Sequence, residues 1–275
     1  MRAYAARPTS LELWDVVRRS AAHEAAGEPL LRKFLGEAIL QYACLDEALA
    51  ALLGSKLADA NLSSATLEAL AREATVADPA IVEAASRDLV AICERDPACS
   101  SELTAFLYFK GFVSLEAYRV NHWLWQTGRH ALAEYLQNRL AESLAVDIHP
   151  AAQLGSGIFI DHATGVVIGE TSVVSDNVSM LQNVTLGGTG KEHGDRHPKI
   201  GPGVLIGAGA SILGNIRVGE DARIGANSVV LRDVPAFTTV AGVPARVVSR
   251  RIDASTETFV APAMSMDQHF PDYQI

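Results

Sequence analysis

Residues 200–230 read IGPGVLIGAGASILGNIRVGEDARIGANSVV, with an aliphatic residue at every sixth position. A period of six fits neither a helix nor a long strand. It is typical of a solenoid in which each hexapeptide makes one short strand and one turn, three to a coil. Glycine often follows the aliphatic residue, where a turn requires positive φ. We therefore predict a solenoid with a narrow apolar core. The core residues of this stretch are Ile200, Ile206, Ile212, Val218, Ile224 and Val230.

The same phase reaches back to residue 148 and is interrupted once, between Leu186 and Ile200. The insert at 187–199 reads GGTGKEHGDRHPK and concentrates histidine, arginine, lysine and glycine. Solenoids tolerate insertions at their corners without any function, yet loops on a rigid scaffold are where binding residues tend to lie. We favour the functional interpretation of this loop. The earlier residues in phase are Ile148, Leu154, Ile160, Ile168, Val174, Met180 and Leu186.

The composition of the chain changes near residue 146. Before this point alanine, leucine, glutamate and arginine follow helical spacing, whereas valine, isoleucine and glycine dominate after it. From residue 249 onward the sequence is polar and aperiodic, as is usual for a mobile terminus. We predict an α+β protein with a helical oligomerisation domain (1–146), a solenoid domain (147–248) and a flexible tail (249–275).

Two kinds of signal predict helix boundaries within the first domain. Asp78-Pro79 and Asp96-Pro97 each place a carboxylate before a proline, which is typical of a helix start. From residue 102 to residue 144 the helical pattern continues, and Gly111 and Gly128 are the predicted breaks.

Composition limits the classes of partner. The net charge of −9 argues against nucleic acid and anionic membranes as general partners. No apolar stretch reaches transmembrane length, and the start MRAYAARPTS lacks the apolar region of a signal peptide. The three cysteines are odd in number and all precede the solenoid, which favours reduced thiols. We expect a cytoplasmic protein that binds neither nucleic acid nor membrane.

Several segments of the chain together resemble the serine O-acetyltransferases, which make O-acetylserine for cysteine biosynthesis from serine and acetyl-CoA. The resemblance covers residues 90–248 well and the first ninety residues only in character. It implies that the solenoid is a left-handed parallel β-helix. It also implies trimers with active sites between neighbouring β-helices, commonly joined through the helical domains into hexamers. The segments are RDPA (95–98), LYFKGF (107–112), DIHPAA (147–152), DHATG (161–165), NVTLGGTG (183–190), GDRHPKI (194–200) and AGVPAR (241–246).

The resemblance assigns three catalytic residues. Serine's hydroxyl is a poor nucleophile at neutral pH and needs a base as it attacks a thioester. His162 occupies the position of the family's catalytic base. Histidine suits this role because its imidazole titrates near neutral pH. Asp147 matches the carboxylate that orients the base, although capping the start of the solenoid would account for it equally well. His197 matches the second family histidine, expected near the substrate carboxylate and the developing oxyanion.

Three further residues match family positions that contact the amino acid. Arg196 can bind the serine carboxylate bidentately, while Asp161 and Asp96 match the acidic positions. Asp96 has the strongest structural alternative, because Asp before Pro is an ordinary helix cap, and both roles can hold together. His149 and His193 are left outside the catalytic set.

Acetyl-CoA, the implied co-substrate, is expected along the groove between two β-helices. Backbone groups beside Gly188, Ala208 and Ala226 would hold the pantetheine arm, since small residues permit close approach. Arg223 and Arg246 are candidates for the phosphates, although solvated surface charge explains them equally well. The solenoid has no cysteine and no serine in a nucleophile elbow, so we expect direct transfer in a ternary complex. No metal is expected.

The C-terminal segment suggests a partner protein. The family's terminal isoleucine inserts into the active site of O-acetylserine sulfhydrylase, and this chain ends at Ile275. The residues before it, PDYQ at 271–274, depart from the family pattern. Family members are commonly inhibited by cysteine competing at the serine site, which makes cysteine a predicted feedback inhibitor.

Three other functions remain open from the sequence. One is a hexapeptide acyltransferase that acts on homoserine, a sugar or an antibiotic hydroxyl. Another is a zinc hydrolyase of the carbonic anhydrase type, in which His162, His193 and His197 supply nitrogen ligands. The third is a noncatalytic assembly scaffold, for which the tail is the best argument.

Overall fold

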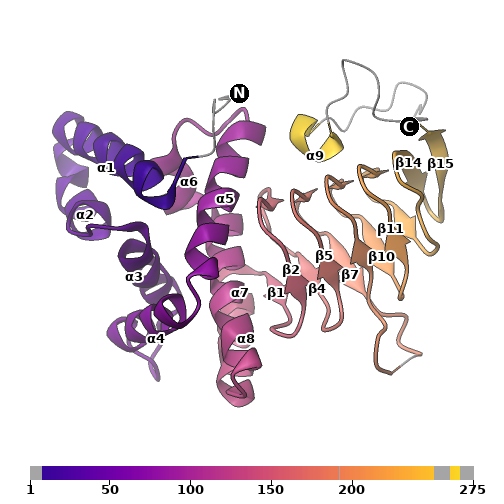
Figure 1. Ribbon diagram of the computed structural model, residues 1–275, viewed down its shortest axis with the longest axis horizontal. Coiled ribbons are helices and arrows are strands. Elements are labelled where there is room, and N and C mark those ends of the chain that lie inside the picture. The colour runs from indigo at the N-terminus through magenta and orange to yellow at the C-terminus, as the bar shows by residue number, and fades with distance from the viewer. Residues whose placement is uncertain (1–7, 192, 251–260, 267–275) are drawn as a thin grey trace. The chain divides into compact units, whose positions relative to one another are not determined.

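The computed structural model describes residues 8–191, 193–250 and 261–266. The chain divides into two compact units, Met1–Ser143 and Leu144–Ile275 (Figure 1). The first unit is helical and the second is built from short strands. The division falls at the end of the last helix of the first unit, which runs to Leu144.

The helical unit begins at a capping box, in which Thr9 accepts a hydrogen bond from the backbone of Glu12 and the Glu12 side chain accepts one from Thr9. Its core includes an aromatic contact between Trp14 and Phe106, whose ring centroids lie 5.5 Å apart. The described helical elements are α1 (Ser10–Gly27), η1 (Pro29–Leu31, 3₁₀), α2 (Arg32–Leu35), η2 (Gly36–Leu40, π), α3 (Leu45–Leu57), α4 (Ser64–Ala77), α5 (Ala80–Arg95), α6 (Glu102–Tyr108), α7 (Lys110–Gln126) and α8 (His130–Leu144).

Two of the predicted helix boundaries need correction. Asp96 does not start a helix: α5 ends at Arg95, and the Asp96 carboxylate accepts a hydrogen bond from the backbone of Ala98 at 2.8 Å. Helix α6 starts only after Ser101, whose side chain caps it. Gly111 lies inside α7, because the break falls at Phe109. Asp78 and Gly128 behave as predicted, at the start of α5 and just after the end of α7.

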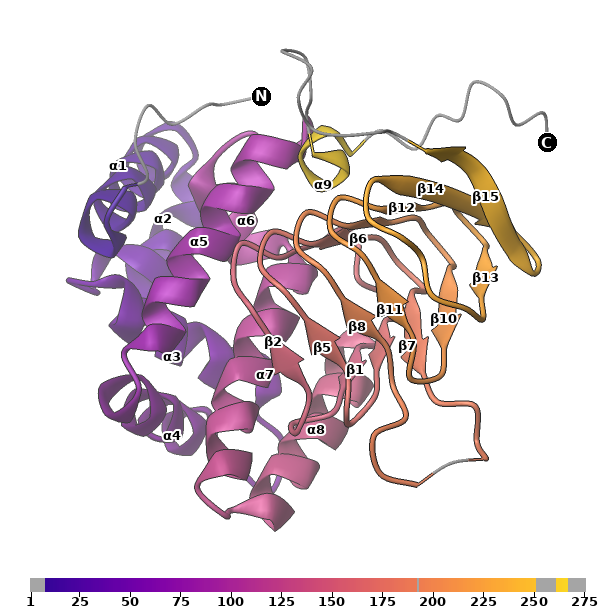
Figure 2. The same cartoon turned by 45° about the vertical axis from the view of Figure 1, so that its right-hand side comes forward.

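The second unit is a three-sided parallel solenoid. Successive strands turn onto three different sheets, so that every third strand pairs (Figure 2). The predicted phase residues fill the core, and all but Leu154 are buried. The strands of its coils are β1 (Asp147–Ile148), β2 (Gln153–Leu154), β3 (Phe159–Ile160), β4 (Val167–Ile168), β5 (Val173–Val174), β6 (Ser179–Met180), β7 (Thr185–Gly187), β8 (Lys199–Ile200), β9 (Leu205–Ile206), β10 (Ser211–Leu213), β11 (Arg217–Val218), β12 (Arg223–Ile224) and β13 (Val229–Val230).

The coils are not all of one length. Val167 pairs with Thr185, eighteen residues later, which is three hexapeptides. Val167 also pairs with Asp147, twenty residues earlier, so the first coil carries two extra residues. They fall in the corner between β3 and β4, where His162 and Ala163 both have positive φ. Two consecutive non-glycine residues in this conformation are unusual.

The last strands leave the coil pattern. Strand β14 (Thr238–Gly242) continues one sheet in parallel with β12, and β15 (Ala245–Arg250) then pairs with β14 in the opposite direction. Beyond it, the short helix α9 (Pro262–Ser265) returns to the solenoid, where the Ser179 hydroxyl donates to the carbonyl of Ala263 at 2.9 Å. This part of the tail is therefore ordered against the solenoid.

The described residues contain no single helix long and apolar enough to cross a membrane. One bent pair, Pro29–Leu40 with Leu45–Leu57 at 118°, reaches that length and apolarity only when taken together.

Candidate active site

Two edges of the solenoid carry most of the predicted site residues of the second unit. Both edges border the sheet of β1, β4, β7, β10 and β13. We call the edge that precedes this sheet along the chain the His162 edge, and the edge that follows it the loop edge. The His162 edge comprises residues 161–166, 181–184, 207–210 and 225–228, and the loop edge comprises residues 149–152, 169–172 and 188–198.

The insert between β7 and β8 projects from the loop edge (Figure 2). Ion pairs hold the residues where the insert joins the solenoid. The Arg196 guanidinium donates to the Glu170 carboxylate at 2.7 Å and to the carbonyl of Gly194 at 3.0 Å. Lys199 pairs with Asp195 at 2.5 Å and donates to two backbone carbonyls. These contacts hold Arg196 in one place while leaving its side chain partly exposed.

His197 is the most constrained residue of the loop edge. Its imidazole is buried, with 7% of the residue exposed. The Nδ1 atom lies 2.9 Å from the Thr171 hydroxyl and accepts a hydrogen bond from the Thr171 backbone N–H at 3.2 Å. A Cβ at Gly169 would overlap the imidazole, so the absence of a side chain at residue 169 makes room for the ring.

The electrostatics of this cluster favour a neutral His197 and a charged Glu170. Burial lowers the pKa of His197, and the cations Arg196 and Lys199 and the nearby His149 lower it further, while Glu170 opposes them. The hydrogen bond from Arg196 lowers the pKa of Glu170. The edge therefore combines an ionised Arg–Glu pair with an uncharged imidazole at neutral pH.

His149, which sequence analysis left outside the catalytic set, lies on the same edge, one coil before Glu170 and two coils before His197. Its Nδ1 accepts a hydrogen bond from the backbone N–H of Ala151 at 3.1 Å. It acts electrostatically on both Glu170 and His197. His193 lies exposed in the projecting loop.

His162 lies on the other edge and faces solvent, with 74% of its side chain exposed. The carboxylate of Asp161 lies 3.9 Å from its Nε2. Asp147 belongs to β1, next to the strand that follows this corner, and its backbone N–H donates to the carbonyl of Val166 at 2.9 Å. Asp147 and Asp161 thus flank the corner that presents His162.

The structure separates the predicted residues into sets rather than collecting them in one place. His162, Asp161 and Asp147 lie at the His162 edge, and Arg196 and His197 lie at the loop edge of the same chain. The sixth residue, Asp96, belongs to the helical unit, in the turn after α5.

Three of the residues predicted for acetyl-CoA divide between the same two edges, and two lie in other strands. Gly188 lies at the loop edge, where a Cβ would stand 3.5 Å from Arg196. Ala208 and Ala226 lie in consecutive coils of the His162 edge, linked by a hydrogen bond of 2.7 Å from the backbone of Asn227 to the carbonyl of Ala208. Arg223 is in β12 and Arg246 in β15.

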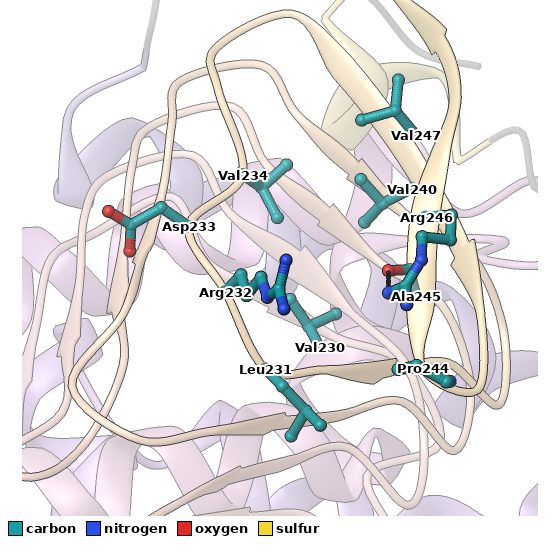
Figure 3. Close-up of a pocket in the computed structure, with 10 residues that line it drawn as sticks. All are labelled: Val230, Leu231, Arg232, Asp233, Val234, Val240, Pro244, Ala245, Arg246 and Val247. Carbon is teal, nitrogen blue, oxygen red and sulfur yellow. Dashed lines mark hydrogen bonds between the residues drawn. The ribbon is translucent and has the colours of Figure 1, made fainter.

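Arg246 lines a cavity of about 270 Å³ between the last coil and the β14–β15 hairpin. Figure 3 shows Arg232 and Arg246 on opposite sides of this space. Asp233 also lines the cavity, but its carboxylate accepts a hydrogen bond of 2.9 Å from the backbone of Arg217. Arg223 is not part of the lining. The cavity therefore offers two cations and an apolar floor that includes Val230 and Val240.

Sequence reasoning missed Gly169, Glu170 and Thr171, which support His197 and Arg196. Their position carried a signal. Residues 169–172 form the corner of the coil that precedes the insert, so a strict count of hexapeptides places them beside the base of the loop. Within the described residues, no group of three or more histidine, cysteine, aspartate or glutamate side chains is arranged to hold a metal ion.

The triangular solenoid and its polar corners define a hexapeptide-repeat transferase, and the bacterial transferase hexapeptide model, with six repeats, matches residues 197–232. A second family model, the N-terminal domain of serine acetyltransferase, matches residues 13–117. The serine acetyltransferase of Salmonella typhimurium is 51% identical over 258 residues, which are 94% of this chain and 92% of the relative. The chain therefore belongs to the serine acetyltransferase family.

Solved structures support the same assignment. The serine acetyltransferase of Vibrio cholerae has a TM-score of 0.91 at 50% identity, covering 95% of this chain and 99% of that one. A serine acetyltransferase in complex with cysteine has a TM-score of 0.91 at 49% identity, covering 95% and 100%. Another, in complex with CoA, has a TM-score of 0.84 at 50% identity, covering 87% and 100%. The predicted helical domain and left-handed β-helix are confirmed, and the family likeness extends further into the first ninety residues than their character indicated.

Proposed function

We propose that this chain transfers the acetyl group of acetyl-CoA directly to the hydroxyl of L-serine, at sites formed between copies of the chain. The observation that carries the proposal is that the predicted site residues lie on two different edges of one solenoid. His162 and Arg196 come from different corners, so one solenoid supplies a base at one edge and a carboxylate anchor at the other. Relatives solved with serine and with CoA support the choice of the two substrates.

The proposed assembly is a three-fold ring, which the position of these two edges supports. They border the two sides of one sheet. If that sheet faces a three-fold axis, the His162 edge of each copy meets the loop edge of the next, and the ring closes with three equal sites. Gly188 and the pair Ala208 and Ala226 also lie on opposite edges. The same packing therefore lines both sides of a groove for the pantetheine arm.

In the proposed reaction, His162 acts as general base. Its neutral imidazole takes the proton of the serine hydroxyl as the oxygen attacks the thioester carbonyl. The tetrahedral intermediate then collapses, the C–S bond breaks, and the imidazolium returns the proton to the departing CoA sulfur. Asp147 orients the imidazole and stabilises its charged form. The exposed side chain of His162, in the corner that carries two extra residues, supports this role.

Substrate recognition uses the remaining residues. Arg196, held by Glu170, binds the serine carboxylate, and Asp161 and Asp96 bind the ammonium group. His197 stands beside Arg196, near the developing oxyanion. Cysteine has the same ammonium and carboxylate groups as serine, so it competes for this site. The phosphates of acetyl-CoA reach Arg246, with Arg232 across the cavity and Arg223 two strands away from Arg246 in the same sheet.

The proposal also includes the hexameric assembly, a partner enzyme and the cellular location. The helical domains join trimers into hexamers, a role supported by the match to the family's N-terminal domain. Ile275, the residue proposed to bind O-acetylserine sulfhydrylase, lies outside the described residues. A cytoplasmic location is supported by the reduced state of the three cysteines, because the sulfurs of Cys93 and Cys99 lie 3.4 Å apart at hydrogen-bonding distance and are not joined in a disulfide.

The proposal is tested by complementation between two inactive variants. His162→Ala and His197→Ala are each expected to release little thiol from acetyl-CoA with serine. Co-expressed in equal amounts, they should recover roughly a quarter of wild-type activity, because that share of sites pairs two intact edges.

The matched control co-expresses His162→Ala with Asp161→Ala. Both lesions lie on the His162 edge, so no interface regains a complete site and activity should stay at the background. Recovery in the control, or none in the first mixture, would contradict sites shared between copies. Release with homoserine in place of serine would change the substrate and leave the shared site intact.

A further inference from the structure

Thr171 makes an unusual set of contacts for a corner residue. Its hydroxyl oxygen accepts hydrogen bonds from the backbone N–H groups of Arg196 at 3.0 Å and His197 at 3.1 Å. The same oxygen lies 2.9 Å from His197 Nδ1. The backbone N–H of Thr171 also donates to that Nδ1, at 3.2 Å. One threonine thus contacts the ring and the backbone of His197 at once.

Counting donors and acceptors fixes the protonation of the imidazole. A backbone N–H can only donate, so the Nδ1 atom that receives it must carry a lone pair. The hydroxyl has two lone pairs and one proton, and both lone pairs are engaged by Arg196 and His197. Its proton is shared between Nδ1 and the carboxylate of Asp195, which also hydrogen-bonds the Thr171 side chain. The backbone N–H of Thr171 therefore decides the state of Nδ1, because it can only donate. A neutral imidazole with an unprotonated Nδ1 carries its proton on Nε2.

We propose that Thr171 is a positioning residue that holds His197 in its Nε2–H form, so that His197 donates a hydrogen bond to the substrate and does not act as a base. This inference rests on the proposed acetyl transfer and assigns a different role to each of the two histidines. His162 moves the proton, and His197 offers a fixed N–H to the negative oxygen that forms at the thioester carbonyl.

The surroundings keep His197 from leaving this state. Protonating Nδ1 would point an N–H at the backbone N–H of Thr171, which costs that hydrogen bond and sets two donors against each other. Burial and the cations Arg196 and Lys199 lower the pKa of His197, as does His149, while Glu170 alone among these groups raises it. The close contact with Gly169 limits rotation of the ring. Geometry and charge therefore favour the same neutral tautomer.

The first test observes the tautomer without any turnover. Nitrogen-15 spectra of histidine-labelled protein at pH 7, with His197 assigned from the His197→Gln variant, should show a protonated Nε2 and an unprotonated Nδ1. Resonances of an Nδ1–H tautomer or of an imidazolium would overturn the proposal. If the wild-type protein does not transfer acetyl from acetyl-CoA to serine, the proposed function is contradicted instead, so the two failures are distinguishable.

The second test compares Thr171→Val with Thr171→Ser. Valine keeps the shape and the backbone N–H but removes the hydroxyl, so the pKa of His197 should rise. The acid limb of the kcat profile should move to higher pH, and kcat at its optimum should fall by about 10²-fold. Serine restores the hydroxyl and should recover most of this loss. Equal damage in both variants, with an unmoved pH profile, would show a merely structural role and overturn the proposal.

Discussion

At the scale of single residues, Arg196 depends on Glu170 for its orientation. The guanidinium donates to this carboxylate at 2.7 Å, and the hydrogen bond lowers the pKa of Glu170 below its usual range. Glu170 is therefore ionised throughout the neutral range and loses its charge only at acidic pH. An exposed ion pair contributes little to stability, but here it selects one position for a long side chain that would otherwise sample many.

We therefore expect Glu170→Gln to raise KM for serine by about tenfold, with a smaller change in kcat, because the carboxylate anchor is disordered while His162 is untouched. Steady-state kinetics with varied serine would measure this change. Glu220→Gln, an exposed carboxylate in the same unit, is the matched control and should leave both constants unchanged. An unaltered KM in Glu170→Gln would show that Arg196 keeps its position without this partner.

The residue types of the site were predictable, whereas their supports were not. His162, Arg196 and His197 have side chains that suit proton transfer and carboxylate binding, so the sequence points to them directly. Glu170 and Thr171 act on residues about 26 positions away, through a contact set by the coil register. The prediction that Asp96 starts a helix is wrong, because Asp96 is the C-cap of α5 and an Asp-Pro pair serves equally well in the turn that follows a helix.

At the scale of elements, the corners of the solenoid stack through residues with positive φ. Gly209 and Asn227 occupy the same place in consecutive coils, and both have positive φ. A Cβ at Gly209 would overlap the amide oxygen of Asn227. The hexapeptide requires glycine here for two reasons, namely the backbone conformation and the close approach of the next coil.

Gly209→Ala should therefore lower the free energy of unfolding by about 1–3 kcal/mol, since it adds backbone strain to a steric overlap. Urea unfolding at matched protein concentration would measure the loss. Gly190 provides the control: it also has positive φ, but a Cβ there would meet nothing within 4 Å. Gly190→Ala should cost only the strain, and an equal loss in the two variants would contradict a contribution from stacking.

The strands were predictable from the six-residue period, because a buried aliphatic residue must recur wherever the chain turns onto a new sheet. The extra pair of residues in the His162 corner was also visible, as the wider spacing between Ile160 and Ile168. The helix breaks were less certain. Gly111 is accommodated inside α7, and the chain breaks at Phe109 instead, where the apolar pattern gives no warning.

At the scale of the whole molecule, the sequence predicted both domains with unequal detail. The solenoid has a repeat, so fold, core and loop could be assigned from the period. The helical domain has no repeat, and helical spacing alone does not specify how helices pack. Within residues 13–117, the resemblance to the family was clear from the sequence only from residue 90 onward, and the match of the earlier part came from comparison with the family model. The distribution of the site over two edges also needed the sheet order, because chain distance does not reveal which corners share an edge.

The reversed strand at the end of the solenoid has a consequence for solubility. Each coil of a parallel solenoid presents unpaired backbone groups to the next, so an open end is a template on which another chain can add. Strand β15 runs opposite to β14 and so ends the parallel stack on that sheet. A chain that stops after Phe237 lacks both strands and should form end-to-end filaments, seen as rising light scattering and fast-sedimenting species. If the truncated chain stays at the size of the intact assembly, the hairpin is not what prevents this growth. The β14–β15 hairpin would thus act as a terminator of polymerisation, keeping a repeating structure finite.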